Sequence, residues 1–139
     1  MLQYAIVFDW VEMAERPGYT PHGRVHFERT VILDTQKDRE TFAVVSLAGP
    51  VAECMYAGYG AQERRRRQLG CWGTDYENAL ASCQDLRRAS LGAIGSFIAR
   101  TERKASELVR YFWPSIILIA GVLERDGKAS FREVAELMR

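Results

Sequence analysis

The sequence has few of the residues that build metal sites and disulfides. Its 139 residues include three cysteines and two histidines. An odd number of cysteines without CxxC spacing indicates neither a disulfide framework nor a zinc ribbon. Free thiols at Cys54, Cys71 and Cys83 are typical of a reducing compartment, so we expect a cytoplasmic protein. His22 and His26 are four residues apart in an extended pattern, which places them too far apart for one metal ion.

Long apolar runs and an excess of charge of one sign are also lacking. The most apolar segment, Tyr111 to Leu123, has 13 residues and contains Pro114. Because a bilayer-spanning helix needs about 20 apolar residues, this segment predicts a buried core helix. Met1 is followed by alternating residues without the basic region of a signal peptide. The net charge of +1 gives no global attraction to nucleic acid or anionic membrane. We therefore expect no membrane association.

The hydropathy pattern changes once along the chain. Apolar residues alternate with others from Leu2 to Val11 and again from Val25 to Leu33, which predicts two neighbouring strands. From Asp38 onward they recur at helical spacing. The pattern predicts an α+β fold with a small N-terminal β-sheet of two or three strands, followed by a bundle of about four helices. We expect a single domain over residues 1–139, with a β region at 1–36 and a helical region at 37–139.

Capping residues predict where most of the helices begin and end. The first helix ends at Gly58, and residues 58–73 form a loop, with or without a short helical piece. Thr74 and Glu77 have the spacing of a capping box, and Ser130 and Glu133 repeat it. Between them, Ser90 caps one long helix, or two that meet near Trp113 and Pro114, ending at Asp126-Gly127.

Four segments have an order and spacing that resemble a known family. They are Leu47–Glu53, Gly73–Ala79, Leu108–Trp113 and Gly127–Met138. Together they resemble the peptidase domain of FtsH-type zinc metallopeptidases and small proteins related to it, over residues 40–138. The resemblance implies that Asp75 occupies the position of the third zinc ligand. It also implies that Glu53 supports the former site.

The His-Glu-x-x-His motif of that family is absent from the sequence. Zinc catalysis needs three protein ligands and a general base, and Asp75 alone cannot hold the ion. We therefore predict a catalytically inactive relative that acts as a binding or scaffold module without a cofactor. The alternative is an N-terminally truncated gene model of an active zinc metallopeptidase, in which an upstream helix supplies the missing ligands. Asp75 also has a purely structural explanation at the start of a helix, where the dipole favours a carboxylate.

Two further expectations concern partners. The run Arg64, Arg65, Arg66 and Arg67 predicts a solvated loop or a partner-facing turn, because Glu63 precedes it and the chain is near neutral. A phosphate or nucleic-acid binder that uses these four arginines is the third alternative, with nucleic acid the weaker choice. A buried Glu53 would need a cationic partner, for which Arg87 and Arg88 are candidates. Loss of the upstream helix would expose apolar residues, and such surfaces usually bind a partner. We therefore expect a homodimer or a protein partner over that surface. The residues concerned are Tyr4, Ile6, Phe8, Val44 and Val51.

Overall fold

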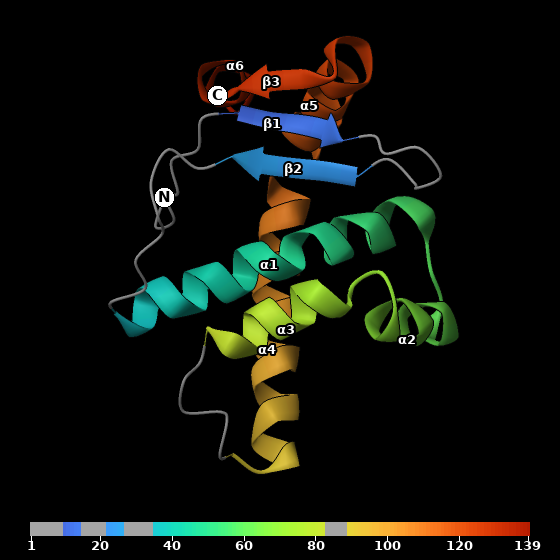
Figure 1. Cartoon of the computed structure of the whole chain (residues 1–139), viewed down its shortest axis with the longest axis vertical. Coiled ribbons are helices and arrows are strands. Elements are labelled where there is room, and N and C mark those ends of the chain that lie inside the picture. The colour runs from blue at the N-terminus through green and yellow to red at the C-terminus, as the bar shows by residue number, and fades with distance from the viewer. Residues whose placement is uncertain (1–9, 15–21, 27–34, 83–88) are drawn as a thin grey trace. The chain divides into compact units, whose positions relative to one another are not determined.

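The structure is a computed structural model of the chain, and it describes residues 10–14, 22–26, 35–82 and 89–139. Six helices contain most of these residues, and the strands are short (Figure 1). The chain divides into two compact units. One comprises residues 32–111, and the other combines residues 1–31 with residues 112–139.

The unit of residues 32–111 is built from four helices. They are α1 (Gln36–Ala57), α2 (Ala61–Leu69), α3 (Gly73–Ala81) and α4 (Leu91–Tyr111). Helix α1 packs against both α3 and α4, and α2 lies next to α3 (Figure 1). None of the residues of α2 is buried. Helix α2 is therefore held at the edge of the unit by side-chain contacts rather than by a hydrophobic face.

Helix α1 is delimited by caps at both ends. At its start, the Thr35 hydroxyl accepts a hydrogen bond from the Asp38 backbone N–H at 3.0 Å, and the Asp38 carboxylate accepts one from Thr35 N–H at 3.1 Å. This reciprocal capping box satisfies two donors that a helix start leaves free. At its end, Gly58 adopts a left-handed conformation with φ of 67°, which favours glycine. The predicted stop at Gly58 is confirmed.

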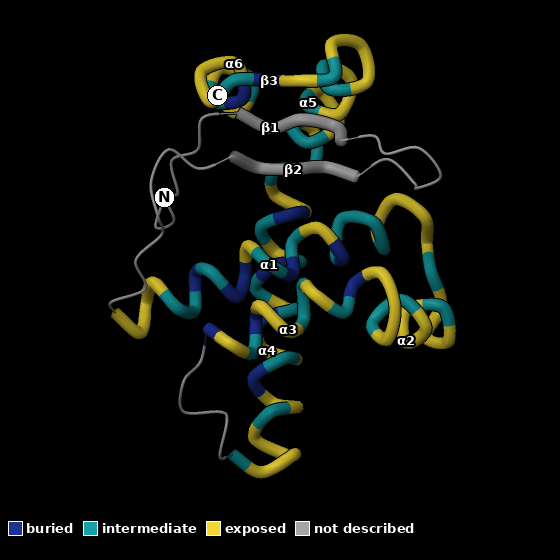
Figure 2. Tube along the Cα trace, viewed as in Figure 1, coloured by how far each residue is buried: buried dark blue, intermediate teal, exposed yellow. Residues whose placement is uncertain are grey.

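The core of this unit consists mostly of small side chains. Leu47 is fully buried, and it packs with alanines that have no exposed surface. Small residues at helix contacts let two backbones approach closely. The buried alanines are Ala43, Ala79 and Ala105. Figure 2 shows the buried positions where α1, α3 and α4 meet.

Helix α4 has a buried stripe with a period of four residues. Its buried residues are Phe97, Thr101, Ala105 and Val109. Residues at this spacing lie on one helix face. The Thr101 hydroxyl donates a hydrogen bond to the Phe97 carbonyl at 2.8 Å, so this buried donor is satisfied. The residues that follow each stripe member in sequence therefore lie at the border between the core and solvent.

The other unit contains a small sheet and two helices. Its elements are β1 (Trp10–Ala14), β2 (His22–His26), α5 (Trp113–Asp126), β3 (Lys128–Ser130) and α6 (Phe131–Leu137). Strand β1 pairs antiparallel with both β2 and β3, in the order β2-β1-β3. Gly127 ends α5 with φ of 71°, and Ser130 and Glu133 form the predicted capping box of α6. The turn at Gly127 and the start of α6 are thus confirmed.

The predicted α+β fold class is wrong, because the described part of the chain is mainly helical. The strands have three to five residues and do not form a separate N-terminal layer, since β3 comes from the C-terminal end of the chain. Most of the alternating run from Leu2 to Val11 lies outside the described residues. Within residues 58–73, which we expected to be mainly loop, α2 forms a nine-residue helix.

Two local predictions also need correction. Thr74 is not an N-cap, because α3 begins earlier, at Gly73, with Trp72 as its cap residue and no side-chain capping bond. The apolar segment from Tyr111 to Leu123 is not a buried core helix, since none of the residues of α5 is buried and Leu118 is 55% exposed. Apolar content alone does not report whether a neighbouring element covers a helix.

The described ranges contain no single helix that is both long and apolar enough to span a membrane. Helices α4 and α5 reach that length and hydropathy only when they are counted as a pair, across the break between them.

Candidate anion-binding cleft

Glu53, near the end of α1, joins three segments of the chain. Its carboxylate accepts a hydrogen bond from Trp72 Nε1–H at 2.7 Å and from Arg67 Nη1 at 2.5 Å. The Tyr59 hydroxyl lies 3.4 Å from the same carboxylate. Trp72 is almost completely buried, so its indole N–H needs this acceptor. A cationic partner was predicted for a buried Glu53; its side chain is 41% exposed, and its partner is Arg67. The candidates Arg87 and Arg88 lie outside the described residues.

Arg67 is fixed from several sides. Its guanidinium lies 4.1 Å from the centre of the Tyr59 ring and bonds Glu63 at 2.9 Å as well as Glu53. Tyr59 in turn packs tilted against Trp72, with ring centres 6.2 Å apart. Cation–π and charge-assisted contacts of this kind position a side chain strongly when it is partly shielded from water. Arg67 therefore attaches α2 to the end of α1.

The four arginines of the 64–67 run have two different environments. Arg66 and Arg67 both bond Glu63, whose carboxyl pKa is lowered mainly by the hydrogen bond from Arg66. The guanidinium groups of Arg64 and Arg65 have no ion pair or hydrogen bond among the described residues, and both residues are exposed. The sequence-predicted set of four is thus reduced to two free cations, which lie on the same helix face as Gln68.

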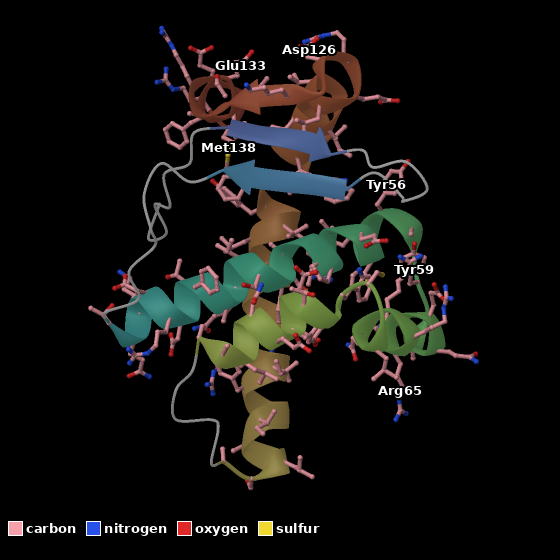
Figure 3. The ribbon with its side chains drawn as sticks, in the orientation of Figure 1. Tyr56, Tyr59, Arg65, Asp126, Glu133 and Met138 are labelled. Atoms are coloured by element: carbon pink, nitrogen blue, oxygen red, sulfur yellow. The ribbon has the colours of Figure 1, made fainter. Side chains whose placement is uncertain are left out.

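These two free arginines border a cleft of about 520 Å³ that lies within the unit of residues 32–111. Helix α1 contributes Val51, Cys54 and Met55, and the α2 face contributes Arg64 and Arg65. Figure 3 shows Arg65 extending from α2 and Tyr59 on the segment that joins α1 to α2. A cleft of this size is typical of small-molecule sites.

Helix α4 contributes a row of polar side chains to the lining of the cleft. Glu102, Ser106 and Arg110 line the cleft at intervals of four residues. Each follows a member of the buried α4 stripe, and residues at this spacing lie on one face, about 6 Å apart along the axis. The Arg110 guanidinium has no ion pair or hydrogen bond in the described part of the chain. This row was not predicted from the sequence. The four-residue spacing of these polar residues, each directly after an apolar-stripe residue, could have indicated that they share one face of the helix.

Tyr76 connects the two walls of the cleft. Its hydroxyl donates to Glu102 Oε1 at 2.7 Å and accepts from Gln68 Nε2 at 3.2 Å. Burial, reinforced by the hydrogen bond to Glu102, raises the pKa of the Tyr76 phenol, so it remains a neutral donor at physiological pH. The chain Gln68–Tyr76–Glu102 therefore links α2, α3 and α4. It leaves the second carboxylate oxygen of Glu102 without a hydrogen bond among the described residues.

Cys54 lies on the α1 side of the cleft, within the electrostatic influence of both Arg64 and Glu102. Burial raises the pKa of its thiol, and the nearby Arg64 charge offsets this only in part. A protonated thiol is a poor nucleophile. The arrangement therefore indicates a packing role for Cys54 rather than covalent chemistry.

Asp75, the predicted vestigial zinc ligand, lies half-buried in the first turn of α3. Burial raises the pKa of its carboxyl, and the charge of Glu53 raises it further. Both oxygens of Glu53 already accept hydrogen bonds. Among the described residues no three His, Cys, Asp or Glu side chains are grouped for a metal ion. The described surroundings of Asp75 thus do not fit zinc, and its former role as a ligand stays a prediction.

Comparisons with family models, with curated proteins and with solved structures gave no match to this chain.

Proposed function

We propose that this chain is a binding module and that its cleft binds a phosphate monoester. The observation that carries the proposal is the charge of the cleft lining. Three arginines and one glutamate line the cleft, which gives a formal charge of +2. A phosphate monoester carries a charge of about −1.5 to −2 at neutral pH. Because Arg64, Arg65 and Arg110 are free of ion pairs among the described residues, their donors are available to such an anion.

The same observation favours a small ligand over nucleic acid. Nucleic-acid surfaces need a basic stripe or patch that follows the phosphate backbone. Here two of the four arginines in the run bond Glu53 and Glu63, so their charges are offset. The whole chain has a net charge of only +1. A single phosphate group in a cleft fits this distribution of charge better than a polymer does.

The resemblance to the FtsH-type peptidase domain is compatible with this proposal, which adopts the binding role and does not depend on the family. The resemblance rests on four sequence segments, of which one contains Glu53 and another contains Asp75. In the present proposal Glu53 holds Arg67 and Trp72 in place beside the cleft. Catalytic inactivity, and the alternative of a truncated active peptidase, stay predictions.

Titration calorimetry with phenyl phosphate tests the proposal. We expect the unaltered protein to bind it, and Arg64→Ala to weaken binding about tenfold or more, because a charge-assisted hydrogen bond contributes about 1.5–3 kcal/mol. The matched control is Arg66→Ala, which removes an arginine two positions away that bonds Glu63 instead. This control should change the affinity less than about twofold. Absence of binding, or equal losses in both variants, would contradict the proposal.

A further inference from the structure

The cleft has more room and more chemistry than a bare phosphate uses. Its volume of about 520 Å³ lies within the range of sites for organic small molecules, about 300–1,000 Å³. The α1 side of the cleft is apolar apart from the Cys54 thiol, with Pro50, Val51 and Met55 facing it. Apolar surface in a binding site favours an apolar part in the ligand. The ligand's organic part therefore has an apolar region.

Glu102 supplies a hydrogen-bond acceptor with spare capacity. An ionised carboxylate accepts about four hydrogen bonds through its two oxygens and donates none. Tyr76 uses Oε1, and Oε2 has no hydrogen bond among the described residues. Since Glu102 is half-buried in the cleft wall, a ligand that covers it without offering a donor would pay for desolvating a charge. A ligand with a hydroxyl or amino group at that point would instead form a charge-assisted bond.

We infer that the ligand is an organic phosphate monoester with an apolar body and a hydroxyl or amino group that donates a hydrogen bond to Glu102. This inference rests on the proposed function, since the arginines hold the phosphate while Glu102 binds a donor group of the ligand's organic part. Ser106 lies one helical turn from both Glu102 and Arg110, and its hydroxyl can bond the ligand between these two side chains. Glu102 is thus the residue that determines specificity, and Arg64 and Arg110 determine affinity.

Two probes that differ in a single hydroxyl group test this inference. They are 4-(hydroxymethyl)phenyl phosphate and 4-methylphenyl phosphate, compared by titration calorimetry on the full chain. The unaltered protein should bind the hydroxymethyl compound about tenfold more tightly, because only this compound offers Glu102 a donor. In Glu102→Gln, the amide oxygen still accepts from Tyr76, and an NH₂ group replaces the free oxygen. The NH₂ group can still donate to the oxygen of the ligand hydroxyl, but a neutral hydrogen bond contributes less than one to a carboxylate. The preference should therefore fall from about tenfold to about threefold in this variant, while both probes still bind.

The outcomes separate the two proposals. If both probes bind the unaltered protein equally, the inference about Glu102 is overturned and the phosphate site stands. If neither probe binds, the proposed function fails, and the inference fails with it. The ratio of the two affinities is taken within each protein, so the effect of the negative charge lost in Glu102→Gln on phosphate binding cancels. The comparison on the unaltered protein needs no variant, so poor folding of Glu102→Gln would not leave the inference untested.

Discussion

Neighbouring arginines of one sequence run differ in what they contact. Arg66 bonds Glu63, whereas Arg64 borders the cleft without an ion pair in the described part of the chain. The sequence indicated an anion-binding role for all four residues, because a charge run does not show which members bond neighbouring carboxylates. Spacing explains the outcome: Glu63 precedes Arg66 and Arg67 by three and four residues, the separations at which helical side chains meet.

Asp75 gives a prediction at the same scale. Burial and the Glu53 charge raise its carboxyl pKa above the ordinary value of 3.8, so the ionised form destabilises the folded state. The helix dipole favours the ionised carboxylate by about 0.3–1 kcal/mol. This stabilisation opposes the effect of burial and of the Glu53 charge, but the pKa of Asp75 stays raised. Because the folded-state pKa is raised, the contribution of Asp75 to stability falls as pH rises from 3.8 through that pKa.

We therefore expect Asp75→Asn to raise the free energy of unfolding at pH 7, by less than about 1 kcal/mol for a half-exposed charge. The gain should disappear below pH 3.8, where both states are protonated. Urea unfolding at pH 7 and pH 3 measures it, with Glu77→Gln as the control because Glu77 is an exposed carboxylate of the same helix. A destabilised variant at pH 7 would instead point to a stabilising role for the charge.

At the scale of elements, caps were the most predictable features. Gly58, Gly127, and the pair Ser130 and Glu133 are local signals, and the structure confirms each. Ser90 also bonds the Ala93 backbone N–H at 3.2 Å, as the sequence indicated. The predicted N-cap at Thr74 is wrong because α3 starts at Gly73, next to the buried Trp72, whose indole N–H bonds Glu53. A tertiary contact set that boundary, and no local pattern reports such a contact.

The two threonines provide a matched pair for testing the caps. Thr35→Ala removes the hydroxyl that accepts from Asp38 N–H, and should lower the free energy of unfolding by about 1 kcal/mol. Thr74→Ala removes an exposed hydroxyl with no hydrogen bond among the described residues, and should change it by less than about 0.5 kcal/mol. Chemical denaturation followed by circular dichroism measures both. A larger loss of unfolding free energy for Thr74→Ala would show that Thr74 caps α3, as the sequence predicted.

At the scale of the whole molecule, the missed features all depend on residues far apart in sequence. The sheet pairs Trp10–Ala14 with Lys128–Ser130, and the cleft combines residues 50–55, 64–68 and 102–110. Hydropathy periods report which face of an element is buried, but not which element covers it. For this reason the helical character of residues 36–57 and 91–111 was predictable, whereas the pairing of β1 with β3 and the α4 wall of the cleft were not.

The expected homodimer or protein partner stays a prediction. One of its premises changes, because Val44 is 2% exposed and packs in the core formed by α1, α3 and α4. Val51 is half-buried at the cleft, and Tyr4, Ile6 and Phe8 lie outside the described residues. Exposed apolar side chains occur elsewhere, as at Ile117 and Leu118 of α5. Val44 itself is therefore not part of an exposed apolar surface.

The most direct test of the central claim is an NMR titration of the full ¹⁵N-labelled protein with phenyl phosphate. Saturable amide shifts should concentrate in residues 50–55, 64–68 and 102–110, the segments that contribute most of the side chains lining the cleft. Residues 36–41 and 91–96, which belong to the same helices but not to the cleft, should shift little. Shifts that follow exposed arginines throughout the chain, or that are absent at saturating ligand, would contradict the account.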